Sequence, residues 1–294
     1  MKKVIVILGP TAVGKTKMSV ELAKNLNGEI INADSTQIFK ELNIATAKIT
    51  EEEKEGIPHH LFDIKAKEDN YTVYEYQKDC REKIDDILKR GKTPILVGGT
   101  GLYIKAALYN YEFEEQQSRS DYSVFSTEEL YNKLLTIDPN TTIHLNNRQR
   151  IERVLDYYNE TGKLPSKEKS DKLLYDTLFI GLTTDREVLY DRINKRVDAM
   201  IDSGLLNEAK WVFESGCRTK AITTPIGYKE LFPYFECKES LETCLNKIKQ
   251  DSRRYAKRQY TWFNNQMEVT WFNVNFDDFN KTIDEVYNYI KKRN

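Results

Sequence analysis

Short apolar runs alternate with amphipathic stretches along the first half of the chain. Residues 4–8, 29–33 and 94–97 are runs of the length and composition of buried strands. Between them, residues 15–25 and 72–90 place apolar side chains at helical spacing, and a glycine follows each stretch. Such alternation predicts an α/β fold in which a parallel sheet is flanked by helices.

The pattern changes near residue 110, where strand signals become sparse and polar helical ones prevail. Ser126 and Glu129 have the spacing of a capping box, and a second helix ends near Gly162. Residues 177–182 return to strand character and lead into another amphipathic helix. We therefore expect a core formed by residues 1–109 and 177–294, interrupted by a helical insertion at residues 110–176.

Composition fits a folded protein that has no membrane partner. The 294 residues are 39% hydrophobic, which is enough for a sizeable core. No apolar run approaches the roughly 18 residues of a membrane span. The four cysteines have no CxxC pair, so they are interpreted as structural thiols. We expect a cytoplasmic monomer.

A net charge of −1 hides a basic segment near the C-terminus. Arg253 and Lys257, like Arg254 and Arg258, are four residues apart on a predicted helix, which aligns them in rows. A solvated helix face is the common meaning of such rows. Acidic residues are sparse between residues 253 and 263, however, and this favours contact with phosphates of a nucleic acid.

The strongest motif follows the first predicted strand. It fits G-x-x-x-x-G-K-[ST] and precedes a predicted helix, which is the setting of a phosphate-binding loop. Its residues are Gly9, Pro10, Thr11, Ala12, Val13, Gly14, Lys15 and Thr16. Glycines let the backbone approach phosphate oxygens, the helix start offers free N–H groups, Lys15 adds a cation and Thr16 a hydroxyl ligand for Mg²⁺.

The loop alone leaves the class of phosphate ligand open. Kinases and NTPases are its commonest owners. The sequence has no Asn-Lys-x-Asp segment for reading guanine, and no later apolar strand leads into an acidic metal ligand. These features disfavour a GTPase or a motor ATPase and leave a small-molecule kinase open.

Two further segments follow predicted strands, where ligands bind in open parallel sheets. Asp34 begins the segment Asp34-Ser35-Thr36-Gln37, and its carboxylate can accept a proton, bind Mg²⁺, or cap a helix. Spacing alone does not separate these roles. Gly98-Gly99-Thr100-Gly101 is interpreted as a tight strand-to-helix turn, in which Thr100 gains interest only beside Asp34.

Several of these segments together resemble the tRNA dimethylallyltransferases, also called isopentenyl-diphosphate:tRNA transferases. The resemblance covers nearly the whole chain in the right order. It rests on GPTAVGKT, EIINADSTQIFKELNIATAK, IPHHLFDI, the stretch at 95–108, IHLNNRQR with Arg153, ETG and Ser166, IGYKE, and YAKRQYTWF. It implies a P-loop NTPase-like parallel sheet with a helical insertion that contacts the anticodon arm of tRNA.

The resemblance also implies roles for individual residues. The loop at 9–16 would bind the diphosphate of dimethylallyl diphosphate, with Mg²⁺ between it and Thr16. Asp34 would act as general base on the N6 amine of the adenosine on the 3′ side of the anticodon, and Thr100 would position that amine. The residues implied in tRNA contact are Asp34, Ser35, Thr36, Gln37, Thr100, Asn146, Asn147, Arg148, Gln149, Arg150, Lys257, Arg258 and Gln259.

Two positions depart from the family pattern. Leu145 stands where a proline is usual, which affects a turn. Thr224 stands near a position that is an arginine in some members, and Arg218 or Lys220 are candidates to replace that charge. Two alternatives of other kinds remain. A dimethylallyltransferase that modifies free adenylate would not need the helical insertion. A non-catalytic RNA-binding module would not need the phosphate loop.

Overall fold

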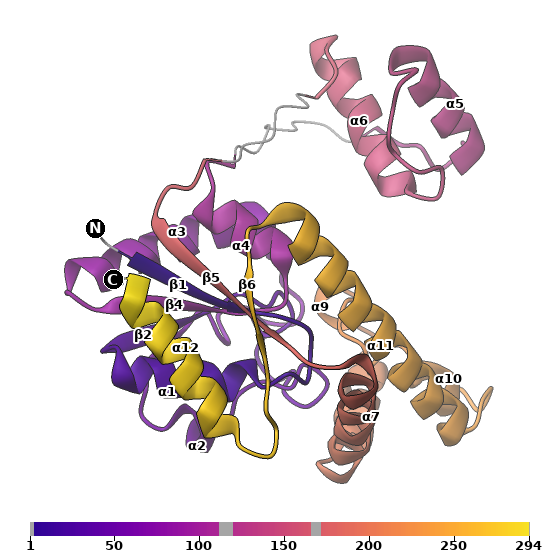
Figure 1. Cartoon of the computed structure of the whole chain (residues 1–294). Coiled ribbons are helices and arrows are strands. Elements are labelled where there is room, and N and C mark those ends of the chain that lie inside the picture. The colour runs from indigo at the N-terminus through magenta and orange to yellow at the C-terminus, as the bar shows by residue number, and fades with distance from the viewer. Residues whose placement is uncertain (1–2, 112–119, 166–171, 294) are drawn as a thin grey trace. The chain divides into compact units, whose positions relative to one another are not determined.

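The computed structural model describes residues 3–111, 120–165 and 172–293 (Figure 1). The chain forms two compact units: a core unit, Met1–Tyr111 with Lys172–Asn294, and an insertion unit, Glu112–Asp171. The core extends past the boundaries expected from the sequence because the two connecting segments bond to each other. The backbone N–H of Asn110 donates to the Lys172 carbonyl, and that of Leu174 to the Leu108 carbonyl.

Six parallel strands form the sheet of the core unit, in the order β3-β2-β4-β1-β5-β6. The strands are β1 (Lys3–Leu8), β2 (Gly28–Asn32), β3 (His59–His60), β4 (Thr93–Gly98), β5 (Asp176–Thr183) and β6 (Thr270–Asn273). The predicted α/β class and its four predicted strands are confirmed. Parallel pairing brings the carboxyl ends of the strands to one edge, where loops meet.

Helices cover both faces of the sheet, and strand alternation shows how the sequence divides between them. Ile5 and Ile7 of β1 pack on one side with α1 and α12, while Val4 and Val6 pack on the other side with α3 and α4. All four are buried. The helices are α1 (Lys15–Asn25), α3 (Val73–Lys89), α4 (Gly101–Leu108) and α12 (Phe279–Arg293).

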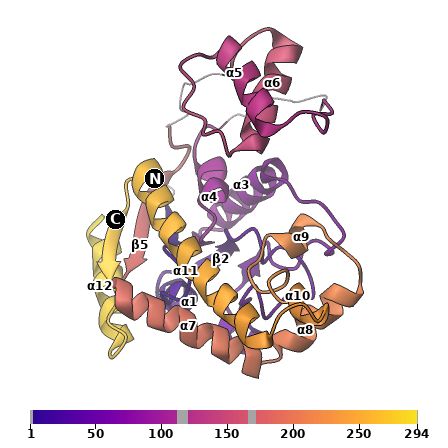
Figure 2. The same cartoon turned by 90° about the vertical axis from the view of Figure 1, so that its right-hand side faces the viewer.

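The core unit has further helices, most of which are labelled in Figure 2. They are α2 (Glu51–Lys54), α7 (Arg186–Asp202), α8 (Leu205–Glu214), α9 (Lys220–Thr223), α10 (Phe232–Phe235) and α11 (Leu241–Gln266). The longest of them, α11, packs against α7 through Ala256, which contacts Leu189 and Ile193. None of the helices in the described parts of the chain has the length and apolarity to cross a membrane.

The insertion unit consists of two helices around a small core of its own. Helix α5 (Thr127–Ile137) begins with the predicted capping box, in which Glu129 N–H donates to Ser126 Oγ and Ser126 N–H donates to Glu129 Oε2. Helix α6 (Arg148–Thr161) ends at Gly162, whose φ of 65° closes the helix. Leu130, Leu134, Ile151 and Leu155 form the buried cluster between the helices.

Candidate functional site

A cavity of about 920 Å³ opens in the core unit where the strands end. The loops after β1, β2 and β4 line it on one side, and α7 and α11 on the other. From the loops, the lining includes residues 11–16 of the predicted phosphate loop, the whole Asp34-Ser35-Thr36-Gln37 segment, and Gly98. The structure therefore brings together the two segments that the sequence placed after separate strands.

The phosphate loop has the backbone shape that its glycines predict. Gly9 and Gly14 have φ values of 140° and 94°, and Ala12 between them is also left-handed at 66°. A side chain at Gly14 would meet the ring of Phe279, the first residue of α12, at 2.7 Å. Because Gly14 caps α1 and the first turn of a helix has no internal acceptors, free N–H groups face the cavity at this point.

Lys15 folds over the loop that carries it. Its Nζ donates to the carbonyls of Gly9 at 3.0 Å and Pro10 at 2.7 Å. Burial of this ammonium lowers its pKa to about 8, while the negative charge of Asp34 acts in the opposite direction. A cation that is held by two neutral carbonyls can turn toward an anionic ligand at small cost.

Two arginines of α7 supply positive charge that the sequence did not reveal. The guanidinium of Arg196 donates to Thr11 Oγ1 at 3.1 Å, and Arg192 Nε donates to the Ala12 carbonyl at 3.0 Å. Burial lowers the pKa of Arg196, and the charge of Asp34 opposes this. The sequence feature that could have indicated them is their i, i+4 spacing on a predicted helix that directly follows a strand.

The two candidates for the missing arginine charge do not line the cavity. Thr224 lines the cavity, but neither Arg218 nor Lys220 does. Arg218 instead lies over the rings of Phe213 and Phe232. The charge comes from α7 because that helix, and not the segment around residue 218, packs directly over the phosphate loop.

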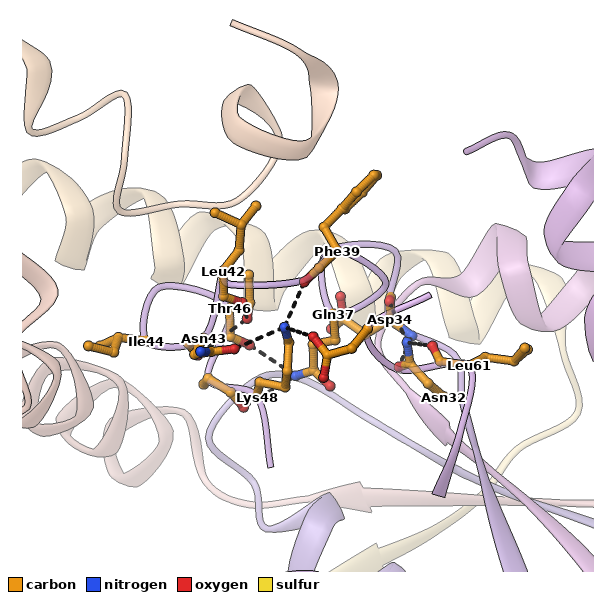
Figure 3. Close-up of polar contacts among 12 residues, drawn as sticks. Asn32, Asp34, Gln37, Phe39, Leu42, Asn43, Ile44, Thr46, Lys48 and Leu61 are labelled. Carbon is orange, nitrogen blue, oxygen red and sulfur yellow. Dashed lines mark hydrogen bonds and ion pairs between the residues drawn. The ribbon is translucent and has the colours of Figure 1, made fainter. Parts of the chain in front are cut away.

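Asp34 shapes a turn and faces the cavity. Its Oδ1 accepts hydrogen bonds from the backbone N–H of Thr36 at 3.0 Å and from Thr36 Oγ1 at 2.7 Å. No α-helix begins here, since residues 35–38 form turns, so the alternative of helix capping is wrong. The backbone of Asp34 is held by Asn32, which accepts from Asp34 N–H and donates to its carbonyl (Figure 3).

Thr100 connects the segment after β4 to the segment after β2. Its Oγ1 accepts from Ser35 N–H at 3.0 Å and donates to Ser35 Oγ at 3.3 Å. Thr100 does not itself line the cavity, so its hydroxyl acts on Ser35 in this structure. Thr100 therefore meets the condition that gave it interest, since it lies beside the Asp34 segment.

The glycines around Thr100 serve close packing. A side chain at Gly98 would lie 2.2 Å from the backbone of Ala33, and one at Gly101 would lie 2.0 Å from the ring of Trp262. Neither glycine has a left-handed φ. The structural interpretation of this turn is confirmed, and its cause is lack of space.

Gln259 has a different position from the one expected of a tRNA contact. Its side chain is buried, and it bridges two loops: Oε1 accepts from Thr11 N–H at 3.1 Å, and Nε2 donates to the Gly99 carbonyl at 3.1 Å. Neighbouring Lys257 and Arg258 are exposed, and Arg258 lines the cavity. Thus α11 presents basic side chains outward and a fixed amide inward.

The two basic rows of α11 are only partly available. Arg253 turns toward α7, where its Nη1 donates to Asn194 Oδ1 at 2.6 Å. Arg254 forms an ion pair with Asp251 at 3.4 Å. Helix packing and an acidic neighbour thus engage two of the four basic side chains in the rows.

In the insertion unit, four of the five expected contact residues are exposed. Asn147 caps α6 by accepting from Arg150 N–H at 3.3 Å. Arg148 faces inward: its guanidinium donates to the carbonyls of Tyr122 and Phe125 and to Glu152 Oε1. We conclude that Arg148 holds the unit together. Its neighbours Asn146, Gln149 and Arg150 remain exposed, and Ser166 lies outside the described residues.

Thr16 is the candidate metal ligand. It is exposed in the first turn of α1 and lines the cavity. The described residues contain no group of three or more His, Cys, Asp or Glu side chains placed to hold a metal. A hydroxyl at a phosphate loop fits Mg²⁺, since this ion is commonly held by few protein oxygens together with phosphate oxygens.

Known proteins share this architecture over its full length. A family model described as IPP transferase matches residues 37–266. A tRNA dimethylallyltransferase of Anoxybacillus flavithermus is 51% identical, covering 99% of this chain and 96% of the relative. The solved tRNA delta(2)-isopentenylpyrophosphate transferase of Staphylococcus epidermidis is 43% identical with a TM-score of 0.77, covering 100% of both chains. A eukaryotic dimethylallyltransferase acting on tRNA has a TM-score of 0.81 at 35% identity, covering 93% of this chain and 74% of that one.

Proposed function

The chain belongs to the IPP transferase family, and from this premise we propose that it transfers a dimethylallyl group from dimethylallyl diphosphate to the N6 amine of the adenosine on the 3′ side of the anticodon in tRNA. The observation that carries the proposal is the shared cavity. It is lined by a phosphate loop with three cationic side chains, Lys15, Arg192 and Arg196, and by the carboxylate segment that begins at Asp34.

The reaction divides between the two sides of this cavity. The N6 lone pair forms a bond to the allylic carbon while the C–O bond breaks, and diphosphate leaves with the electron pair. Asp34 accepts the proton that N6 loses, which matters because conjugation with the ring makes this amine a poor nucleophile. Lys15, Arg196 and the N–H groups at the start of α1 stabilise the charge that grows on the diphosphate.

Mg²⁺ fits the donor side. Thr16 would supply the hydroxyl oxygen, and the diphosphate would supply the other ligands. When bound, the ion adds charge stabilisation for the leaving group. The same loop shape is also suited to a nucleotide, which leaves ATP as a second candidate ligand.

The tRNA is proposed to contact both units. Exposed Lys257 and Arg258 on α11 offer phosphate contacts beside the cavity, and Asn146, Gln149 and Arg150 offer them on the insertion unit. Extrusion of the target base costs a few kcal/mol, which such contacts offset. We propose a monomer that acts in the cytoplasm, where tRNA is available.

The proposal is tested by incubating the protein with dimethylallyl diphosphate, Mg²⁺ and unmodified tRNA, then analysing the nucleosides by mass. A gain of one dimethylallyl group on adenosine is expected. AMP offered in parallel separates this activity from the adenylate-modifying alternative. Phosphoryl transfer from ATP without any allyl transfer would replace the proposal by a kinase.

A further inference from the structure

A buried ammonium group lies at the centre of the segment that follows β2. The side chain of Lys48 is only 5% exposed. Its Nζ donates to the Phe39 carbonyl at 2.6 Å, to Asn43 Oδ1 at 3.0 Å and to Asp63 Oδ1 at 2.6 Å (Figure 3). These acceptors use all three N–H groups of the ammonium. One side chain therefore ties together three separate points of the chain.

The backbone around this ammonium is strained. Four residues without a glycine's freedom have left-handed φ values: Glu41 at 65°, Ala47 at 48°, Leu61 at 62° and Asp63 at 54°. This conformation is unfavourable for residues that carry a side chain. Such conformations persist only where surrounding contacts determine them, and they gather at functional sites. Two of the four are in direct contact with Lys48: Ala47 precedes it in the chain, and Asp63 accepts a hydrogen bond from its ammonium.

The strained segment reaches the cavity through Gln37. The side-chain N–H groups of Gln37 donate to the carbonyls of Thr46 at 2.9 Å and Ala47 at 3.2 Å. Ala45, Thr46 and Ala47 line the cavity with Gln37 and Asp34. The shape of the loop that ends at Lys48 therefore sets the position of Gln37.

A carboxylate of α8 holds the same loop from the other side. Glu208 accepts from the backbone N–H groups of Asn43, Ile44 and Ala45 and from Tyr228 Oη at 2.7 Å. The loop is thus fixed between a cation that binds its carbonyl and side-chain oxygens and an anion that binds its N–H groups. Such opposed charge-assisted contacts are stronger than neutral ones and leave little freedom.

We propose that Lys48 is a positioning residue for the acceptor side of the reaction, and this rests on the proposed function. Lys48 does not line the cavity, so it touches no substrate. Its ammonium keeps the loop at residues 39–47, with left-handed Glu41 and Ala47, in the shape that orients Gln37 and the Asp34 segment toward the entering base. The donor side, built on β1 and α7, does not depend on it.

The test compares Lys48→Met with a matched control, Glu29→Gln. Glu29 is also a buried ionic group, but it lies near the amino end of β2 and does not itself line the cavity. Three quantities are measured at a temperature where every variant is folded: amide hydrogen exchange of residues 39–47, affinity for inorganic pyrophosphate, and kcat and KM with tRNA.

For Lys48→Met we expect faster exchange in residues 39–47, pyrophosphate affinity within about twofold of wild type, and a loss in kcat/KM for tRNA of on the order of ten- to a hundredfold, as small misplacements cause. Glu29→Gln should keep all three values within about twofold. Should Lys48→Met fail to fold, Asp63→Asn keeps an acceptor oxygen but removes the negative charge of a half-exposed partner of Lys48. It should lower kcat/KM about two- to fivefold in the same pattern.

The inference is overturned if exchange in residues 39–47 is unchanged, if pyrophosphate affinity falls as much as kcat/KM, or if Glu29→Gln shows the same loss. A wild-type protein without transfer activity would instead refute the proposed function. The exchange measurement still decides in that case whether Lys48 holds the loop.

Discussion

Charged side chains lie at both ends of β2, and their surroundings differ. At the amino end, Glu29 is 2% exposed and accepts from Arg90, Lys92 and His60 at 2.7 Å each. At the carboxyl end, the described residues donate to only one carboxylate oxygen of Asp34. The closed cluster stabilises the sheet, whereas the open one keeps an oxygen for a ligand. The structural carboxylate is thus buried with both oxygens bonded, whereas the one placed for chemistry is partly exposed with one oxygen free of protein donors among the described residues.

The comparison is tested most strongly by Asp34→Asn. Asparagine keeps an oxygen for Thr36, so the turn should persist, but it cannot accept the N6 proton. We expect the transfer rate to fall on the order of a hundred- to ten-thousandfold with the melting temperature nearly unchanged. Single-turnover rates measure the effect. Asp69→Asn is the matched control, because Asp69 also accepts a backbone N–H in a turn, but outside the cavity. Unaltered transfer would remove Asp34 from the mechanism.

At the other end, Glu29→Gln should unfold more easily and still react. Contacts with Arg90, and then with Lys92 and His60, lower the pKa of Glu29 far below its usual value. A carboxylate with a lowered folded pKa stabilises above its unfolded pKa of about 4.3, and this contribution is lost as pH falls below that value. We expect a loss of about 3 kcal/mol at pH 7 that shrinks toward pH 3.

Urea unfolding at several pH values measures this loss. Exposed Glu52→Gln serves as the control and should be neutral. A stability difference between Glu29→Gln and wild type that does not change with pH would contradict the assignment.

The donor side predicts a pH effect of its own. Burial lowers the pKa of Lys15 to about 8, so its positive charge is present below that pH and lost above it. Affinity for inorganic pyrophosphate should therefore fall about tenfold as pH rises through this range, the magnitude of one charged hydrogen bond. Calorimetric titration measures it. A Lys15→Met variant should bind weakly throughout and lack the step near pH 8. If it keeps that step, Lys15 is not the group responsible.

The smallest expected effects lie on the outer surface. Lys257→Gln and Arg150→Gln should each weaken tRNA binding slightly and lower the slope of log affinity against log salt concentration by about 1. Filter binding at several salt concentrations measures both. Lys238→Gln is the control, since Lys238 pairs with Glu236. Equal slopes for all variants would exclude these two residues from phosphate contact.

The phosphate loop and Asp34 could be found from sequence because each follows a strand, and parallel strands bring such positions together. The helical insertion was visible as a change of periodicity. By contrast, β6 is an edge strand of only four residues, too short for a pattern to distinguish.

The missed site residues share one cause. Arg192 and Arg196 have the sequence pattern of a solvated helix face, and only the packing of α7 over the phosphate loop gives them a ligand-facing role. Gln259 has the same limit, because its bridge joins loops that are far apart in the chain. Lys48 is the last residue of the family motif EIINADSTQIFKELNIATAK, yet its contacts depend on a backbone shape that no residue preference predicts.

The packing of Phe279 against Gly14 has a consequence for synthesis. Phe279 begins α12 and lies against the glycine that caps α1, with Lys17 Nζ 5.1 Å from the centre of its ring. A nascent chain has made the phosphate loop long before it makes this aromatic residue. The loop therefore reaches its final surroundings only after residue 279 has left the ribosome, more than 260 residues after the loop itself was made.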